Sequence, residues 1–331
     1  MKPNLRYVSD RRPKKNISAS DAEKLGIDII LSLNGVEESN PKPWNDYLRT
    51  AAGKGVELEM IKVLKQNGIV DEDYDQDTEW VDGVGEDGLP FSKEQPRDST
   101  KVERNGVTIS MRFDAEVKKG GAKISLEKLN IPSSEVIEML EGEPIEIKSV
   151  NNKNSFDIQK YKDGNPRSNY VKQLAIYMDA LGKEQGHLFV ATIDGLHTFW
   201  FTCRKVGEGL YKCGNVEVDL NLEYARFAEI YADSKRVWDV HAMKKWWNEE
   251  QYKIPLKDVK WAGMSVTEIG NIRNGRKVVG TEGKFKIDYS GYKDLIIRMQ
   301  GHTLGYTGEE LAEIRDVTEG FSAKPKAEPK E

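Results

Sequence analysis

The sequence has few cysteines, with only Cys203 and Cys213 among 331 residues, and it lacks an apolar run long enough to cross a bilayer. Two thiols exclude a zinc or iron–sulfur site built from cysteines alone, and such low usage is typical of a reduced, intracellular protein. The basic N-terminus has no apolar segment behind it, which excludes a secretory signal. We therefore expect a cytoplasmic protein with no membrane partner and no iron–sulfur cluster. A hairpin could bring the two cysteines together as a disulfide.

The chain also lacks a net positive charge, since its formal charge is -5. Taken alone, this argues against a nucleic-acid partner. However, residues 71–98 hold eleven acids and only two bases, so the rest of the chain is net basic. Residues 253–299 contain ten bases and five acids. The composition is therefore compatible with a DNA partner, and Arg273, Arg276 and Lys277 are candidate substrate-binding residues in that stretch. An ordinary solvated surface would show the same excess.

Hydrophobic periodicity predicts the order of the secondary-structure elements. An alternating strand ends in Asp114, a second strand covers 143–150, and an Asp-Gly turn predicts a hairpin over 187–203. Helical patterns cover 44–67, 133–142, 167–182 and 221–250. This order predicts an α/β fold in which a central mixed β-sheet is flanked by helices.

The composition divides the chain into four parts. We expect a basic N-terminal arm over 1–42 and a core over 43–250, with an acidic insertion at 68–100 that is rich in Gly and Pro and reads as a loop. A small C-terminal subdomain over 251–321 and a disordered tail over 322–331 follow.

Polar residues on the two central strands are the candidate chemistry-bearing groups. In the strand "EPIEIKSV" at 143–150, Ile145 and Ile147 alternate with Glu146 and Lys148, so the carboxylate and the ammonium share one face. Asp114 lies on the polar face of the other strand. Two carboxylates on neighbouring strands would form an oxygen-rich site suited to Mg²⁺ or Mn²⁺. Taken alone, an acid and a lysine two residues apart on a strand are more often a surface ion pair.

The motifs of these elements together resemble the PD-(D/E)XK nuclease superfamily, in its RecB-like exonuclease branch. The resemblance spans about residues 43–250 and depends on four motifs: Gly53-x-x-x-Glu57 in the first helix, "RFD" ending in Asp114, "EIK" at 146–148, and "QLAIY" containing Gln173 and Tyr177. It implies a PD-(D/E)XK nuclease-like core. It also implies that Asp114, Glu146 and Glu57 hold Mg²⁺ or Mn²⁺, that Lys148 is the catalytic lysine, and that Gln173 and Tyr177 grip DNA near the scissile phosphate.

The sequence departs from the family pattern at three points. The four-cysteine iron–sulfur cluster of some relatives cannot form with two cysteines. Phe113 occupies the position of the proline before Asp114, and the spacing from Asp114 to Glu146 is wide, which we attribute to the predicted helix over 133–142. Two alternatives stay open: Glu59 could replace Glu57, and Glu116, on the same strand face, could replace Asp114.

The function implied is a metal-dependent deoxyribonuclease that hydrolyses phosphodiester bonds. An exonuclease on single-stranded or end-bearing DNA, acting in replication, recombination or repair and suited to a phage-like origin, is favoured. A structure-specific or restriction-type endonuclease with the same site is the alternative. A non-catalytic nucleic-acid-binding module of nuclease fold is the second class, and cleavage that requires Mg²⁺ would discriminate against it.

Overall fold

The computed structural model describes residues 16–35, 44–75, 78–84, 90–96, 100–151, 155–235 and 290–292. The chain separates into two units, which are described individually. One unit comprises Ser18–Ala22 and Asn45–Arg226, and it contains the central sheet. The other comprises Met1–Ile17, Glu23–Trp44 and Phe227–Glu331. The predicted C-terminal subdomain and tail, apart from residues 290–292, lie outside the described residues.

A six-stranded mixed sheet forms the centre of the first unit, with the order β13-β12-β11-β10-β9-β6. β9 and β10 are parallel, and the other neighbouring strands are antiparallel. The predicted α/β class with a central mixed sheet is therefore confirmed. The strands are β6 (Ala115–Glu116), β9 (Pro144–Val150), β10 (Gln185–Thr192), β11 (Thr198–Gly207), β12 (Leu210–Cys213) and β13 (Val216–Asp219).

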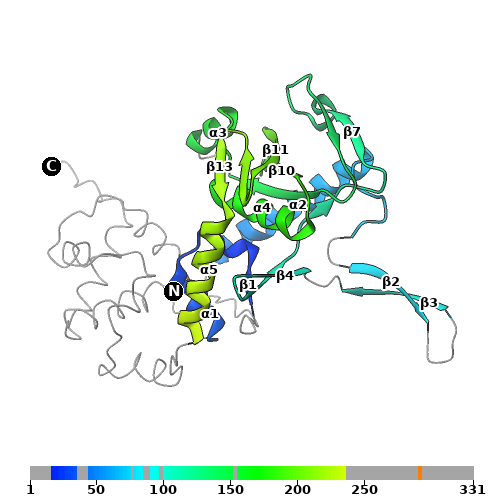
Figure 1. Ribbon diagram of the computed structural model, residues 1–331. Coiled ribbons are helices and arrows are strands. Elements are labelled where there is room, and N and C mark those ends of the chain that lie inside the picture. The colour runs from blue at the N-terminus through cyan, green and yellow to red at the C-terminus, as the bar shows by residue number, and fades with distance from the viewer. Residues whose placement is uncertain are drawn as a thin grey trace, which may run out of the picture. The chain divides into compact units, whose positions relative to one another are not determined.

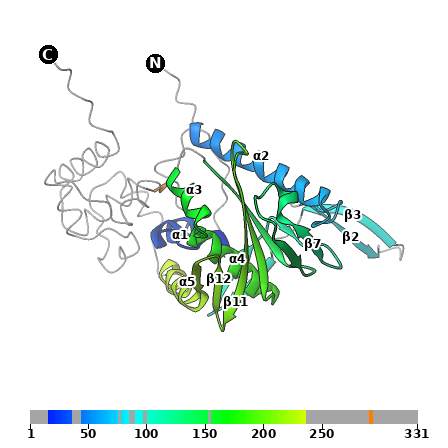
Figure 2. The same cartoon turned by 90° about the horizontal axis from the view of Figure 1, so that it is seen from above.

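Helices α2 (Trp44–Gln66) and α4 (Ser168–Leu181) flank this sheet, as Figures 1 and 2 show. Met60, Ile61 and Leu64 of α2 belong to one buried cluster with Ile145 and Ile147 of β9. α4 packs against β9 and β10. Because successive residues of a strand point to opposite faces, the isoleucines of β9 enter the α2 side and Glu146 and Lys148 point to the α4 side.

Both helices follow from the sequence pattern. Val171, Leu174, Ala175 and Met178 are fully buried along α4, as the periodicity predicts. The helix ends at Gly182, whose φ of 63° is a left-handed conformation that glycine adopts without strain. Both predicted helices are confirmed.

The remaining strands form three smaller sheets. β1, β5 and β4 form a three-stranded sheet, while β2 pairs with β3 and β7 pairs with β8. Their bounds, with those of the other helices, are β1 (Ile17–Ser18), η1 (Ala19–Asp21), α1 (Gly26–Leu33), β2 (Thr78–Val84), β3 (Pro90–Pro96), β4 (Thr100–Arg104), β5 (Val107–Met111), β7 (Ala122–Ser125), η2 (Leu126–Leu129), β8 (Val136–Met139), α3 (Ser155–Lys162) and α5 (Leu220–Lys235).

The helix predicted over 133–142 is wrong, because this segment forms β8. Ile137 and Met139 are buried, whereas Val136 and Glu138 are exposed, which is the period of a strand. β8 pairs antiparallel with β7, in a register that places Ile137 opposite Ile124. Pairing with another strand thus overrides a short local pattern that also fits a helix. The wide spacing between Asp114 and Glu146 is filled by β7, η2 and β8.

The loop predicted over 68–100 is also wrong. Gly68, with a φ of 66°, ends α2, and Ile69 and Val70 directly after it are buried in the core. β2 and β3 then form a hairpin in register from Thr78 opposite Pro96 to Val84 opposite Pro90. The acidic segment therefore contains ordered strands.

Two element boundaries differ from the sequence-based predictions. The strand expected to end in Asp114 is split, since β5 ends at Met111 and Asp114 lies in a bend before β6. α5 is described to Lys235, and the rest of the helix predicted over 221–250 lies outside the described residues.

Candidate active site

Strand β9 places Glu146 and Lys148 on one face, as the alternation predicts. The Glu146 side chain is fully buried, and its Oε1 is in close contact with Nζ of Lys148. The Lys148 side chain remains 23% exposed. Neither oxygen of Glu146 accepts a hydrogen bond of ordinary geometry. The carboxylate of this ion pair therefore lies inside the protein, whereas the lysine side chain reaches solvent.

The bend between β5 and β6 brings Asp114 to the same place. Its Oδ2 accepts a hydrogen bond of 2.7 Å from the backbone N–H of Ile147, which lies between Glu146 and Lys148. Burial, and then the negative charge of Glu146, raise the pKa of Asp114 from 3.8 to about 8. The structure brings Asp114 and Glu146 close together, but Asp114 lies in the bend before β6 and not on a strand as expected.

The positive charge beside Asp114 and Glu146 does not balance the two carboxyl groups. Burial raises the pKa of Glu146, although the ammonium of Lys148 opposes this shift. Burial opposes the charge on Lys148, but Glu146 and Asp114 attract it strongly enough to raise the pKa of the lysine overall. One lysine thus faces two buried carboxyl groups, and an additional cation would favour the ionised form of both acids.

The geometry favours Asp114 over Glu116. Asp114 is bonded to the backbone of β9 and interacts with both Glu146 and Lys148. Glu116 lies within the short strand β6, opposite Pro144, and is not among the groups that shift the pKa of Glu146.

The geometry likewise favours Glu57 over Glu59 on α2. The charge of Glu57 contributes to raising the pKa of Glu146. Glu59 is 69% exposed and forms a surface ion pair with Lys62, with 2.6 Å between Oε1 and Nζ. Gly53, one turn before Glu57, lies close to β9: a Cβ atom there would come within 2.7 Å of Oγ of Ser149. The glycine therefore lets α2 approach the strand without displacing the Ser149 side chain.

Helix α4 contributes Gln173 and Tyr177. Nε2 of Gln173 donates a hydrogen bond of 2.6 Å to the Tyr177 hydroxyl, which donates one of 3.0 Å to the carbonyl of Arg112. Burial, and then the charge of Glu146, raise the pKa of Tyr177. The two residues are therefore tied to the chain just before Asp114, and Tyr177 lies near Glu146.

The donor set fits a hard divalent cation. No group of three or more His, Cys, Asp or Glu side chains in the described ranges is arranged to hold a metal ion. Mg²⁺, however, is usually bound by one or two carboxylates and completes its shell with water and substrate phosphates. Asp114 and Glu146 supply that number of carboxylates, and the oxygens of Glu146 lack ordinary hydrogen-bond donors. Glu57 is close enough to act on Glu146 electrostatically, which suits a supporting position.

Two other sets of residues were singled out in the sequence. Arg273, Arg276 and Lys277 lie outside the described residues. Cys203 and Cys213 lie directly opposite each other on the antiparallel strands β11 and β12. Both are buried free thiols and do not form a disulfide.

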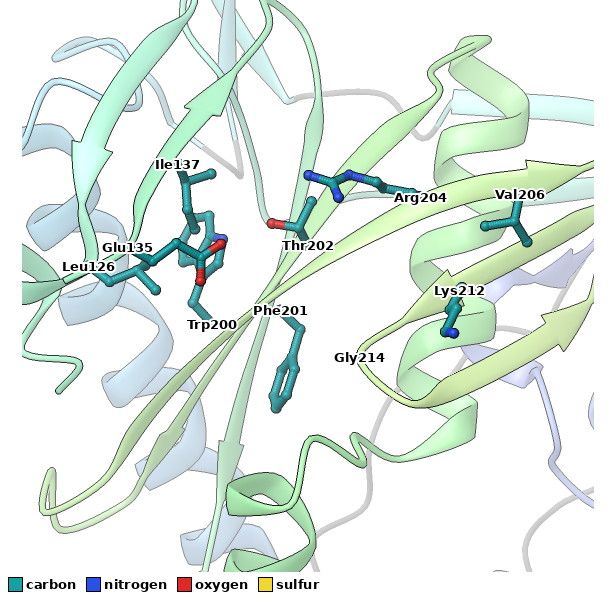
Figure 3. A pocket seen from close by; sticks show the side chains of 10 residues that line it. All are labelled: Leu126, Glu135, Ile137, Trp200, Phe201, Thr202, Arg204, Val206, Lys212 and Gly214. Atoms are coloured by element: carbon teal, nitrogen blue, oxygen red, sulfur yellow. The ribbon is translucent and has the colours of Figure 1, made fainter. Parts of the chain in front are cut away.

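A separate surface hollow lies along β11, and Figure 3 shows the side chains that line it. Glu135 and Ile137 at β8 face Trp200, Thr202 and Arg204 of β11 across it. None of the predicted site residues lines this hollow. The sheet thus presents a mixed polar and apolar concavity that is distinct from the buried carboxyl pair.

Sequence reasoning missed two groups. Tyr170 lies against Lys148, with 5.7 Å between Nζ and the ring centroid; its position three residues before Gln173 was the available signal. Glu143 is buried one residue before β9 and bonds to His187 with 3.0 Å between Oε2 and Nε2. Nothing local in the sequence marks that pair, since its two members are 44 residues apart.

Comparison with known proteins finds only remote likenesses. No protein-family model matches the chain, and no curated protein matches its sequence. An alkaline exonuclease (LHK-Exo) from Laribacter hongkongensis is similar in structure, with 13% identity and a TM-score of 0.37 over 72% of this chain and 96% of that chain. Its complex with dAMP gives 12% identity and a TM-score of 0.37 over 71% and 94%. The protein SSO0001 gives 15% identity and a TM-score of 0.32 over 70% and 80%.

None of the described helices is both long and apolar enough to cross a bilayer.

Proposed function

We propose that this protein is a Mg²⁺- or Mn²⁺-dependent nuclease that hydrolyses phosphodiester bonds in DNA, and that it belongs to the RecB-like branch of the PD-(D/E)XK superfamily. The observation that supports this best is the buried meeting of Asp114 and Glu146 beside Lys148. Two acids and a lysine in this arrangement match, residue by residue, the motif on which the family resemblance depends.

Each residue has a defined part in the proposed reaction. Asp114 and Glu146 would hold the cation, and Glu57 would support it from α2. A divalent cation in this position supplies a Lewis acid that withdraws charge from the phosphate under attack. Gln173 and Tyr177 of α4 would orient the DNA strand. These groups fix the phosphate in place before the chemical step, which accounts for a large share of catalysis in such reactions.

Lys148 would act as a positively charged donor. Because Glu146 and Asp114 raise its pKa, the ammonium keeps its proton at neutral pH and is a poor general base. A fixed ammonium at the open side of the site can instead orient the attacking water and stabilise negative charge that develops on the phosphate.

We favour an exonuclease, with an endonuclease acting through the same residues as the alternative. The two differ in whether the substrate must offer an end. Linear and covalently closed circular DNA of one sequence, incubated with Mg²⁺ or with excess chelator, distinguish them. An exonuclease degrades only the linear form, and an endonuclease opens the circle.

The proposal is tested by cleavage assays on variants of the site. Lys148→Ala and Asp114→Asn should remove cleavage of linear DNA while the proteins remain folded by circular dichroism. Glu116→Gln and Glu59→Gln are matched controls, since each removes one carboxylate close in sequence to a proposed ligand, and both should cleave at the wild-type rate. Full activity of folded Lys148→Ala, or of the wild type in excess chelator, would contradict the proposal. Binding of DNA without cleavage under all conditions would indicate the non-catalytic module.

A further inference from the structure

Helix α4 carries three side chains along the polar face of β9. Tyr170, Gln173 and Tyr177 are spaced by three and four residues, which places them on one side of the helix. The charge of Glu146 raises the pKa of Tyr177, and the ring of Tyr170 contacts Lys148. Each member of the Glu146–Lys148 pair therefore has a tyrosine of α4 beside it.

The ring of Tyr170 contacts two cations. Nζ of Lys148 lies 5.7 Å from the ring centroid, and Cζ of Arg167 lies at the same distance. Nη1 of Arg167, the residue that caps the start of α4, donates a hydrogen bond of 3.4 Å to the Tyr170 hydroxyl. Both cation-to-centroid distances are within the range of about 6 Å over which a cation is attracted to an aromatic face. Arg167 thus anchors the phenol at its rim, and the ring presents its π system to Lys148.

Lys148 requires a contact other than Glu146, because Glu146 would also bind the metal. With no metal bound, the ammonium lies against Oε1 of Glu146. A cation held by Glu146 would draw on the same carboxylate and repel the lysine. A lysine side chain released in this way would gain rotamer freedom. A fixed aromatic ring beside the ammonium limits that freedom without competing for the carboxylate.

We infer that Tyr170 is a positioning residue: its ring keeps Lys148 at the open side of the site when Glu146 is engaged by metal. This inference rests on the proposed nuclease function and assigns the residue that orders its lysine. Tyr170 itself need not touch the reacting atoms. Its effect should therefore appear in the chemical step and should depend on the ring rather than on the hydroxyl.

Steady-state kinetics with Mg²⁺ tests this role. Tyr170→Leu should lower kcat about tenfold, which corresponds to a cation–π contact of 1–2 kcal/mol, and should leave KM within about twofold. Tyr170→Phe keeps the ring and should stay within about threefold of the wild-type kcat. Tyr231→Leu is the matched control, because it removes a contact of the same kind, with 4.1 Å between Nζ of Lys235 and the ring centroid, and it should leave kcat unchanged.

A second readout does not depend on activity. In protein labelled with ¹³C at the lysine ε-carbons, the signal of Lys148 is assigned by its loss in Lys148→Arg. The ring current of Tyr170 should displace this signal, so Tyr170→Leu should move it toward the position of exposed lysines, and Tyr170→Phe should not. An unmoved signal in Tyr170→Leu would overturn the inference, even if kcat fell, because the effect would then be structural.

The failures of the two proposals are distinguishable. If Lys148→Ala is inactive while Tyr170→Leu keeps the wild-type kcat, the positioning role is wrong and the nuclease proposal stands. If folded Lys148→Ala cleaves at the wild-type rate, the nuclease proposal fails and the positioning role fails with it.

Discussion

Two buried glutamates, one directly before β9 and one within it, differ in what surrounds them. Glu143 accepts hydrogen bonds from the backbone N–H of Leu140 at 3.0 Å and from Nε2 of Gln185 at 3.2 Å, and it contacts Nε2 of His187 at 3.0 Å. Glu146, three residues later, accepts no ordinary hydrogen bond and contacts only one cation, Lys148, among the interactions described above. Both side chains are almost fully inaccessible.

The difference shows that burial alone does not indicate function. Glu143 is a satisfied polar group, which a fold tolerates because its hydrogen bonds replace those lost with water. Burial raises the pKa of Glu146 and of its neighbour Asp114; the charge of Glu146 adds to the shift of Asp114, and the charge of Glu57 adds to the shift of Glu146. Carboxyl groups left in that state are where an additional ligand would stabilise the protein most.

The largest expected effect is a difference in cleavage rate between variants of Glu146 and Glu143. Glu146→Gln should lower the cleavage rate on the order of 10³-fold, because the neutral amide binds the cation poorly, while its shape is retained. Glu143→Gln should keep the rate of the folded protein within a few-fold. The measurement is the initial rate of nucleotide release from end-labelled DNA, normalised to the folded fraction. Equal losses in the two variants would remove the distinction between them.

The pH dependence of the free energy of unfolding should follow the titration of Asp114. Its pKa is 3.8 when unfolded and about 8 in the folded protein, so between these values only the folded state holds the proton. Without metal, stability should therefore fall as pH rises from 4 to 8, by about 2–5 kcal/mol from this group. Urea unfolding in chelator at pH 5 and pH 8.5 measures this fall. Asp114→Asn should flatten most of it and Glu116→Gln should not; a fall that is unchanged in Asp114→Asn would contradict the raised pKa.

Glu143 should matter for stability instead. Glu143→Ala leaves the N–H of Leu140, Gln185 and His187 without their acceptor in the interior, which should lower the free energy of unfolding by about 3 kcal/mol. Burial lowers the pKa of His187, so a neutral imidazole donates to Glu143, and the loss should persist at pH 8. Chemical unfolding of the variant and the wild type provides the value. A change below about 0.5 kcal/mol would show that these bonds contribute little.

The smallest effect belongs to the exposed acid of α2. Glu59→Gln removes an ion pair in which both side chains are more than half exposed, and it should change the free energy of unfolding by less than about 0.5 kcal/mol. Glu57→Gln, two residues closer to Gly53, should instead weaken metal binding. If the two variants behave alike in metal binding, the assignment of Glu57 over Glu59 is wrong.

The sequence allowed part of the site to be predicted. Period-two alternation placed Glu146 and Lys148 on one strand face, since that pattern depends only on local geometry. The choice between Asp114 and Glu116 needed the bend before β6, and the choice between Glu57 and Glu59 needed the rotation of α2 against the sheet. Both depend on tertiary packing, which one sequence does not reveal.

The errors in the sequence-based predictions also arise from tertiary packing. Val136 and Ile137 fit a short helix locally, but pairing with β7 makes the segment a strand. Tyr170 lay next to the recognised motif, yet its relation to Lys148 spans two elements and 22 residues. Local pattern therefore predicted the central sheet and its two flanking helices, whereas the inserted hairpins and the contacts between elements required the structure.

Binding of Mn²⁺ tests the central claim most directly, because it measures the role of the carboxyl pair apart from any choice of DNA substrate. Free Mn²⁺ is counted by electron paramagnetic resonance during titration of the wild type, Glu146→Gln and Glu143→Gln at pH 8.5, above the pKa of Asp114. We predict saturable binding by the wild type and by Glu143→Gln, and its loss in Glu146→Gln. Binding by folded Glu146→Gln that equals that of the wild type would contradict the assignment of this pair as the metal site.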